Sequence, residues 1–186
     1  MKPEESKIYS YHEYIQWEGR WELINGVPFN MSPSPNLNHQ FAVGELYYAF
    51  RSFFGNKDCF VAIAPFDVRF SENSDYENTK DILQPDISVI CNKNQLVKNG
   101  CLGAPTLVVE VLSPSTAQKD RNEKFKKYQQ FEVKEYWIVD PNYKIIEVYG
   151  FEEGYFRKKE AFGETQTAKS FVFPDLVVDI DTLFMD

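Results

Sequence analysis

The stretch Thr106-Leu107-Val108-Val109-Glu110-Val111-Leu112-Ser113 decides the fold, because its aliphatic residues follow one another almost without interruption. Ala104-Pro105 precedes it and Pro114 follows it. A short apolar run between such breakers is typical of a strand that is buried on both faces of a sheet. Glu110 is the exception within it. An ionised carboxylate buried alone costs several kcal/mol, so such a group is paired, protonated or bound to a metal.

A second carboxylate stands at the start of another apolar strand, in Gln84-Pro85-Asp86-Ile87-Ser88-Val89-Ile90. If the two strands pair antiparallel, Asp86 and Glu110 meet at one end of the sheet, about 5 Å apart at Cβ if they share a face. Two carboxylates that close repel each other unless they share a proton or a divalent cation such as Mg²⁺. The alternative is that Asp86 only begins a strand and Glu110 pairs with an Arg or Lys elsewhere.

The segments around this acid pair predict a mixed α/β fold. Two segments with a helical apolar pattern predict helices over residues 38–54 and 117–131. Residues 21–24 and 27–31 around Asn25-Gly26 predict an N-terminal β-hairpin, followed by a loop over residues 32–36. Strands and hairpins make up the remainder. The order predicts a central mixed sheet flanked by helices, in a single domain over residues 1–186.

Composition limits the possible partners. The formal net charge is −8, from 20 basic and 28 acidic residues, so no global attraction to nucleic acid or to an anionic membrane is expected. A local basic patch remains open, made of Lys93, Lys98, Lys119, Arg121, Lys124, Lys126 and Lys127.

The cysteines and the absence of long apolar runs bear on the cellular compartment. Cys59, Cys91 and Cys101 are odd in number and lack C-x-x-C spacing, which indicates neither a disulfide framework nor a zinc site. No apolar run approaches about 18 residues, and the N-terminal residues lack the apolar centre of a signal peptide. A cytoplasmic protein without membrane contact is expected.

The helix after Glu110 carries the third chemical component. Asp120, Lys124 and Tyr128 are spaced by four, so they follow one stripe of that helix. A lysine on this stripe could orient an attacking water or offset the negative charge that grows on a phosphate. The alternative is a solvated helix face, on which the Asp120–Lys124 pair contributes only about 0.3–0.5 kcal/mol.

In combination these residues resemble the P-D…(D/E)-x-K nuclease superfamily. More closely, the chain resembles the Uma-type family of restriction-endonuclease-like proteins of bacteria, over roughly residues 11–149. The matching pieces are residues 21–26 (WELING), 31–35 (MSPSP), His39 with Glu45, 84–86 (QPD), 109–115 (VEVLSPS), the 120/124/128 stripe and 135–141 (EYWIVDP).

The resemblance implies that Asp86 and Glu110 bind Mg²⁺ or Mn²⁺, with the backbone carbonyl of Val111 and the side chain of Glu45 as further ligands. It also implies in-line attack of water on a phosphodiester, with DNA as the expected substrate. The chain departs from the pattern at one catalytic position. Leu112 replaces the lysine expected two residues after the glutamate, and Lys124 on the following helix is the position that matches.

Four residues have both a supporting and a structural interpretation. His39 contacts phosphate or only helps to start its helix, and Glu22 belongs to the site or only to its strand and turn. Tyr128 is a core residue or holds Lys124 or Glu110 through its hydroxyl group. Glu45 faces the metal site, as the resemblance implies, or is a plain surface glutamate.

Three functions remain open. The first is a Mg²⁺-dependent endonuclease, expected as a homodimer by analogy with related nucleases. The second is a catalytically inactive nuclease-like module for binding or assembly, which Leu112 fits as well as a relocated lysine. The third is a metal-dependent hydrolase of a smaller phosphoester.

Overall fold

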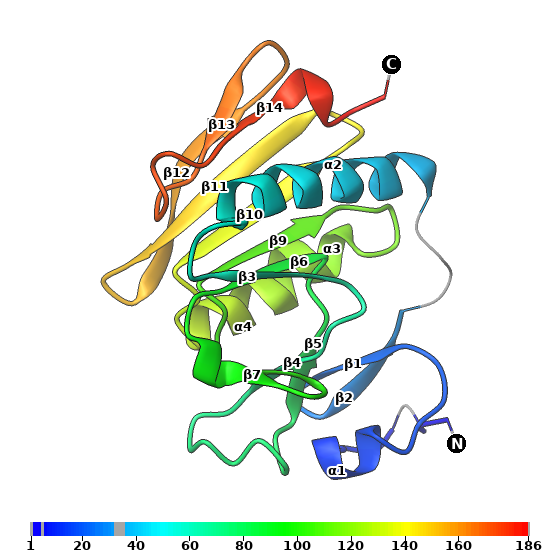
Figure 1. The fold of residues 1–186 in the computed structure, drawn as a ribbon. Helices are drawn as coiled ribbons and strands as arrows, with labels where there is room; N and C mark the ends of the chain where they lie inside the picture. Colours follow the sequence, from blue (N-terminus) through cyan, green and yellow to red (C-terminus); the bar gives the residue numbers. More distant parts are fainter. Residues whose placement is uncertain (1, 5, 32–35, 186) are drawn as a thin grey trace.

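The computed structural model describes residues 2–4, 6–31 and 36–185, and its strands form two six-stranded sheets and one two-stranded sheet. The loop expected over residues 32–35 lies outside the described residues. The two large sheets lie one above the other in Figure 1, with the N-terminal segments in the lower one. The site described below lies where these two sheets meet.

The central sheet has the strand order β12-β11-β10-β9-β6-β3. Its strand β10 pairs parallel with β9, and the other neighbours pair antiparallel, so the sheet is mixed as predicted. The stretch around Glu110 is β9, with every residue buried, near the middle of the order. The bounds are β3 Phe60–Ile63, β6 Ile87–Ile90, β9 Leu107–Val111, β10 Glu135–Asp140, β11 Ile145–Glu152 and β12 Tyr155–Phe162.

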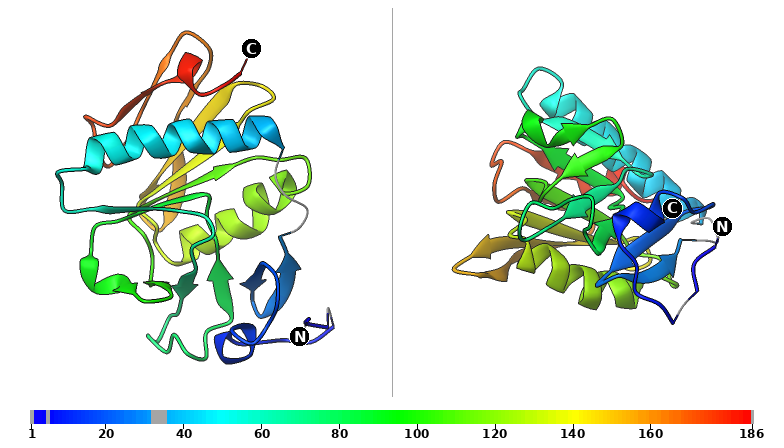
Figure 2. Two further views of the ribbon diagram at one scale, coloured as in Figure 1. Left: turned by 45° about the vertical axis from the view of Figure 1, so that its right-hand side comes forward. Right: turned by 90° about the horizontal axis from the view of Figure 1, so that it is seen from below.

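Helices cover both faces of this sheet, as the sequence predicts (Figure 2). Helix α2, Leu37–Phe54, packs with the odd-numbered side chains of β9, such as Val109. The second helix runs from α3 (Ala117–Lys119) through a π-helical turn, η2 (Asp120–Lys124), into α4 (Phe125–Gln130). It packs with the even-numbered side chains, such as Val108. Among the described residues, the helices are too short or too polar to cross a lipid bilayer.

A second sheet was not predicted from the sequence. Its order is β2-β1-β5-β4-β8-β7, and it contains the predicted N-terminal hairpin of β1 and β2. Pro28 lies in the edge strand β2, where a missing N–H does no harm. The other strands are two or three residues long, too short to give a periodic signal. The bounds are β1 Trp21–Ile24, β2 Val27–Asn30, β4 Val68–Phe70, β5 Asp81–Leu83, β7 Leu96–Val97 and β8 Gly100–Leu102.

The remaining elements are short. Helix α1 begins after Ser10, whose backbone N–H donates to the side chain of Glu13 at 2.8 Å. Strands β13 and β14 form the two-stranded sheet near the C-terminus. The bounds are α1 Tyr11–Tyr14, η1 Lys93–Gln95, β13 Thr167–Lys169, β14 Val177–Asp179 and η3 Ile180–Thr182.

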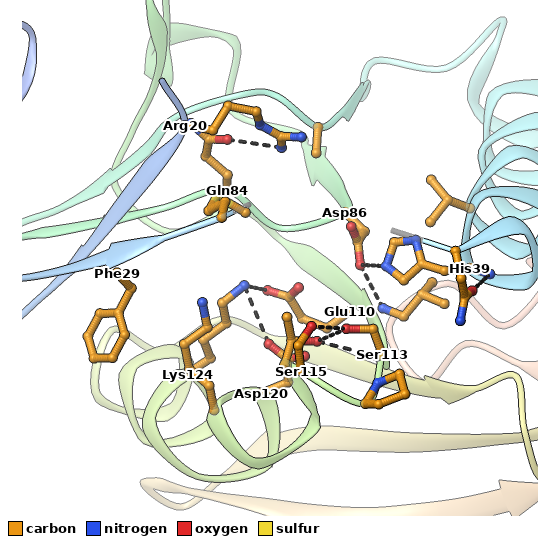
Figure 3. Close-up of a pocket in the computed structure, with 18 of the residues that line it drawn as sticks. Arg20, Phe29, His39, Gln84, Asp86, Glu110, Ser113, Ser115, Asp120 and Lys124 are labelled. Atoms are coloured by element: carbon orange, nitrogen blue, oxygen red, sulfur yellow. Dashed lines mark hydrogen bonds and ion pairs between the residues drawn. The ribbon is translucent and has the colours of Figure 1, made fainter. Parts of the chain in front are cut away.

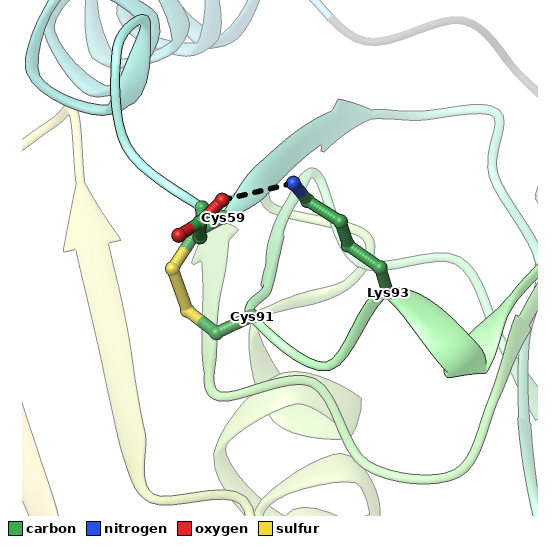
Figure 4. Close-up of a disulfide and its surroundings, with 4 residues drawn as sticks. Cys59, Cys91 and Lys93 are labelled. Atoms are coloured by element: carbon green, nitrogen blue, oxygen red, sulfur yellow. Dashed lines mark hydrogen bonds and ion pairs between the residues drawn. A yellow bond between two sulfur atoms is a disulfide. The ribbon is translucent and has the colours of Figure 1, made fainter.

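The cysteine prediction was wrong, because Cys59 and Cys91 form a disulfide (Figure 4). Cys59 precedes β3 and Cys91 follows β6, and in this antiparallel pair Phe60 lies opposite Ile90. The next residues outward are therefore brought together by the strand register, which a sequence separation of 32 does not show. The odd count arises from Cys101, which is buried and free.

A buried carboxylate fixes the chain near the C-terminus to the central sheet. Glu135, at the start of β10, is fully buried. Its Oε1 accepts hydrogen bonds from Trp137 Nε1 at 2.6 Å and from the backbone N–H of Phe171 at 2.9 Å. Its Oε2 accepts from Ser170 Oγ and from the backbone N–H of Val172, both at 2.7 Å. All four donors meet one carboxylate, so its role is structural.

Glu135→Gln is expected to lower the free energy of unfolding by about 3 kcal/mol, or the thermal midpoint by roughly 6–12 °C. The amide turns one acceptor oxygen into a donor that faces two other donors. Urea and thermal unfolding measure the effect, with Glu160→Gln on the exposed face of β12 as the matched control. Equal stability of the two variants would contradict this role.

Candidate metal and phosphate site

The predicted acid pair forms where β6 and β9 end. These strands pair antiparallel with Ile87 opposite Val109, so the next step of the register places Asp86 opposite Glu110. The antiparallel pairing inferred from the sequence is therefore confirmed. The two carboxylates enter the site from neighbouring strands, at the sheet end that faces the N-terminal sheet (Figure 3).

Pro85 shapes the backbone beside this pair. One further step of the register places Pro85 opposite Val111. The backbone N–H of Val111 donates instead to Asp86 Oδ2 at 2.8 Å, which draws the carboxylate towards the plane of the sheet. Proline has no N–H, so it cannot donate a ladder hydrogen bond to the carbonyl of Val111. The Pro-Asp sequence thus orients the carboxylate of Asp86. It also removes the N–H at position 85 that could otherwise donate to the carbonyl of Val111.

Helix α2 contributes a histidine to the same carboxylate. His39 Nε2 lies 3.3 Å from Asp86 Oδ2, and the ring is buried between the helix and the sheet. Asn36 caps the helix by accepting from the backbone N–H of His39 at 2.9 Å. His39 therefore belongs to the capped first turn and also contacts Asp86. Its contact with phosphate stays a prediction.

The helix after β9 brings its predicted stripe onto Glu110. Lys124 Nζ lies 2.8 Å from Glu110 Oε1, and the hydroxyl of Tyr128 donates to the same oxygen. Lys124 also lies 3.5 Å from Asp120 Oδ1. The lysine is only 2% exposed, so the alternative of a solvated face is wrong.

Glu22 reaches this cluster from the other sheet. Its carboxylate is fully buried in β1, with Oε1 at 2.9 Å from Lys124 Nζ and Oε2 at 2.7 Å from Lys119 Nζ. The backbone N–H of Gln84 also donates to Oε1 at 2.9 Å. Glu22 therefore belongs to the buried ion cluster around Lys124, and its role in the site stays a prediction.

A π-helical turn lies where the helix carries these residues. The sequence predicts one regular helix, but residues Asp120–Lys124 form a π-turn within it. Such turns occur frequently at functional sites. The hydroxyl of Tyr136 donates to the backbone carbonyl of Asp120 at 3.1 Å, so a side chain from β10 supports the irregular turn. Apolar periodicity carries no signal for a single π-turn.

The buried acids of the cluster differ in the direction of their pKa shifts. Burial raises the pKa of Glu110 well above its usual value, against the attraction of Lys124 and with the repulsion of Asp120 and Asp86. Burial likewise raises the pKa of Asp120. Burial also acts on Glu22, but Lys124 and Lys119 outweigh it and hold the pKa of that carboxyl at about 2.

Lys124 is a permanent cation in this setting. Burial by itself lowers an ammonium pKa, but Glu110, Glu22 and Asp120 outweigh it and raise the pKa of Lys124 well above its usual value. An ammonium that does not lose its proton cannot serve as a general base near neutral pH. A protonated lysine can orient groups and offset negative charge.

Glu22→Gln is expected to destabilise the protein by about 3 kcal/mol at pH 7. Because the folded pKa of Glu22 lies below its unfolded value, its contribution is complete above pH 4.5 and is lost as the pH falls through about 2. The stability difference from the wild type should therefore shrink between pH 4.5 and pH 2.5 in urea titrations. A difference that stays constant over this range contradicts an ionised Glu22.

These side chains line a cavity of about 680 Å³ between the two sheets and both helices (Figure 3). Asp86, Glu110, His39, Asp120 and Lys124 all belong to its wall. Residues that the sequence analysis did not propose as site residues line it too: Arg20, Phe29, Gln84, Ser113, Ser115 and Lys119. The pattern that identified Glu110, one acid in a short apolar strand, is also present at Glu22 and could have favoured Glu22 as a site residue.

The donors around the cavity suit a hard divalent cation. Asp86 and Glu110 supply carboxylate oxygens, and the carbonyl of Val111 adjoins them. Within the described ranges no three His, Cys, Asp or Glu side chains converge as a ready-made cluster, so a bound cation would need water or substrate oxygens as further ligands. Glu45 is half-buried on α2 and is absent from the cavity wall, so its role as a ligand stays a prediction.

The expected basic patch does not form as one exposed surface. Lys124 and Lys127 are buried, the latter with Nζ at 3.0 Å from Asp81. Arg121 pairs with Glu147 at 3.2 Å, and Lys93 pairs with Asp58 at 3.0 Å. The sequence shows the basic residues but not which acidic residues pair with them, because those partners come from distant strands and loops.

Comparison with known proteins gives a consistent family. A family model described as "Uma2: Putative restriction endonuclease" matches residues 11–181. An uncharacterised protein of Synechocystis sp. is 32% identical over 123 residues, which span 64% of this chain and 61% of that relative. A crystal structure of a "putative nuclease belonging to DUF820" from Anabaena variabilis superposes with a TM-score of 0.74 at 20% identity, covering 94% of this chain and 96% of the other. That likeness shows a shared fold.

Proposed function

The chain belongs to the Uma2 family of restriction-endonuclease-like proteins, and we propose that it is a Mg²⁺-dependent endonuclease acting on DNA. One observation carries the proposal. Asp86 and Glu110 lie opposite each other at one sheet end, and a buried ammonium, Lys124, contacts the second of them. Packing alone explains neither two acids at adjoining strand positions nor a lysine brought onto one of them.

Each residue has a role in this reaction. Asp86, Glu110 and the carbonyl of Val111 would hold the metal, whose charge would favour ionisation of a bound water and polarise the phosphate. Lys124 stays protonated and offsets the charge that grows on the phosphate oxygens. His39 fixes the orientation of Asp86, and Tyr128 fixes that of Glu110.

Leu112 is compatible with activity. It is buried with Val108 and Tyr128 in the core between β9 and α4. Lys124 enters from the helix above the same face of the sheet and reaches Glu110. The amine that Leu112 lacks is thus supplied from another element, which favours a relocated lysine over a decayed site.

A titration with Mn²⁺ followed by thermal unfolding tests the proposal, together with cleavage of a supercoiled plasmid in Mg²⁺. Metal should raise the thermal midpoint of the wild type and not that of Asp86→Ala. The same variant should leave the plasmid intact. A well-folded wild type without metal response or cleavage would instead identify an inactive binding or assembly module. Turnover of small phosphoesters alone would indicate the third function, and size-exclusion chromatography tests the homodimer.

A further inference from the structure

We propose that Lys119 binds a phosphate of the substrate strand and that Glu22, from the N-terminal sheet, positions it together with Lys124. The inference rests on the proposed function, since it names a substrate contact of the same site. Glu22 is a positioning residue in this scheme, and Lys119 is a binding residue. Neither role follows from the acid pair itself.

Glu22 holds the two lysines by dividing its oxygens between them. Oε1 lies 2.9 Å from Lys124 Nζ, and Oε2 lies 2.7 Å from Lys119 Nζ. The carboxylate is itself fixed by the backbone N–H of Gln84 and by its complete burial in β1. A buried, ionised carboxylate with three donors has little freedom, so it sets the separation of both ammonium groups.

Lys119 is the more exposed of the two lysines that line the cavity. Its side chain is 15% exposed, against 3% for Lys124, and it lines the same cavity as His39 and Asp86. An ammonium group has three donors, and Glu22 takes one of them. The ring of Phe29, with its centroid 5.5 Å from Lys119 Nζ, adds a weak attraction and keeps the group at the wall.

The charge balance favours an anion at this wall. Glu22 contacts both ammonium groups, and Lys124 is shared with Glu110 and Asp120 as well, so Lys119 is the cation that keeps donors for an anion. The acid pair beside it holds a cation in the proposed reaction. A phosphodiester placed between them meets positive charge on both sides, in a partly desolvated cavity where such attraction is stronger than in water. The chain's overall charge of −8 makes such a local contact more important for binding DNA.

Binding without cleavage tests the phosphate contact. A short fluorescent DNA, single-stranded and as a duplex, is titrated in Ca²⁺ and followed by anisotropy at several salt concentrations. Lys119→Met should raise Kd roughly tenfold and lower the slope of log Kd against log salt by about one. Lys119→Arg should keep most of the affinity. Lys169→Met, on the exposed β13, is the matched control and should equal the wild type.

A double-mutant cycle tests the role of Glu22. Glu22→Gln should weaken binding in the wild type but add little in the Lys119→Met background, because Glu22 acts through Lys119. A merely structural Glu22 would leave the two effects on Kd additive, whatever the loss of stability. If Glu22→Gln fails to fold, Glu22→Asp, which keeps the charge and shortens the reach, takes its place in the cycle.

The outcomes separate the two proposals. The inference is overturned if Lys119→Met has the same Kd and the same salt slope as Lys169→Met. It is also overturned if the wild type binds no DNA in Ca²⁺. Additive effects in the cycle overturn the positioning role of Glu22. Wild-type DNA binding that depends on Lys119, without any metal response or cleavage, supports the phosphate contact and rejects the endonuclease.

Discussion

Glu110→Gln is expected to abolish Mg²⁺-dependent cleavage, by about 10³-fold or more, while leaving the fold at least as stable as the wild type near pH 7. The loss follows because the amide supplies no negative charge to the metal. The stability follows from the raised pKa of Glu110, which shows that the folded protein disfavours the ionised form. Above its unfolded pKa the carboxylate therefore opposes folding, and a neutral isostere removes that penalty.

Thermal unfolding and plasmid cleavage measure the two halves of this prediction. The amide oxygen can still accept from Lys124 and Tyr128, so local packing is retained. Glu160→Gln, on the exposed side of β12, should change neither quantity. Retained cleavage contradicts the ligand role, and a midpoint lower by several degrees contradicts the inferred penalty of the buried charge.

Lys124→Met is expected to destabilise the protein by about 3–5 kcal/mol, because it leaves Glu22, Glu110 and Asp120 facing one another without their shared cation. Cleavage should be lost as well. Divalent cations should stabilise this variant more than the wild type, because the metal then offsets carboxylate charges that the Lys124 ammonium group offsets in the wild type. Urea unfolding with and without Mn²⁺ measures both effects.

Two further variants sharpen this result. Lys126→Met, an exposed residue of the same helix, should change stability by no more than about 0.5 kcal/mol. Adding Glu110→Gln to Lys124→Met should recover part of the lost stability, because it removes one of the three repelling charges. A Lys124→Met protein as stable as Lys126→Met, with no added metal response, would contradict the ion cluster.

Local sequence was sufficient for the parts of the fold that repeat or alternate. The uninterrupted apolar strand around Glu110, the two flanking helices and the Asn25-Gly26 hairpin were all predicted, because propensity, period and turn chemistry agree there. The second sheet was not, because its strands are two to four residues long and pair across distant segments. The disulfide was missed for the same reason, since only strand register brings Cys59 to Cys91.

In the candidate site, too, only the features that are local in the sequence were predicted. Asp86, Glu110 and the Lys124 stripe were found because each stands out within its own segment. Glu22 kept a structural alternative and Lys119 was assigned to the basic patch. Neither assignment could be refined, because the contact between these two residues joins two distant elements. A carboxylate in β1 and an amine in α3 carry no sign in the sequence that they meet. Charge patterning along one helix cannot supply that information.

The meeting of Glu22 with Lys119 spans 97 positions of the chain, which has a consequence for the order of folding. Contacts between such distant segments form late, after the loop between them has closed. During synthesis, a growing chain that has exposed Asp86 still lacks the helix that brings Lys119 and Lys124. The acidic half of the centre therefore exists before the basic half, and the complete centre appears only when both sheets have docked.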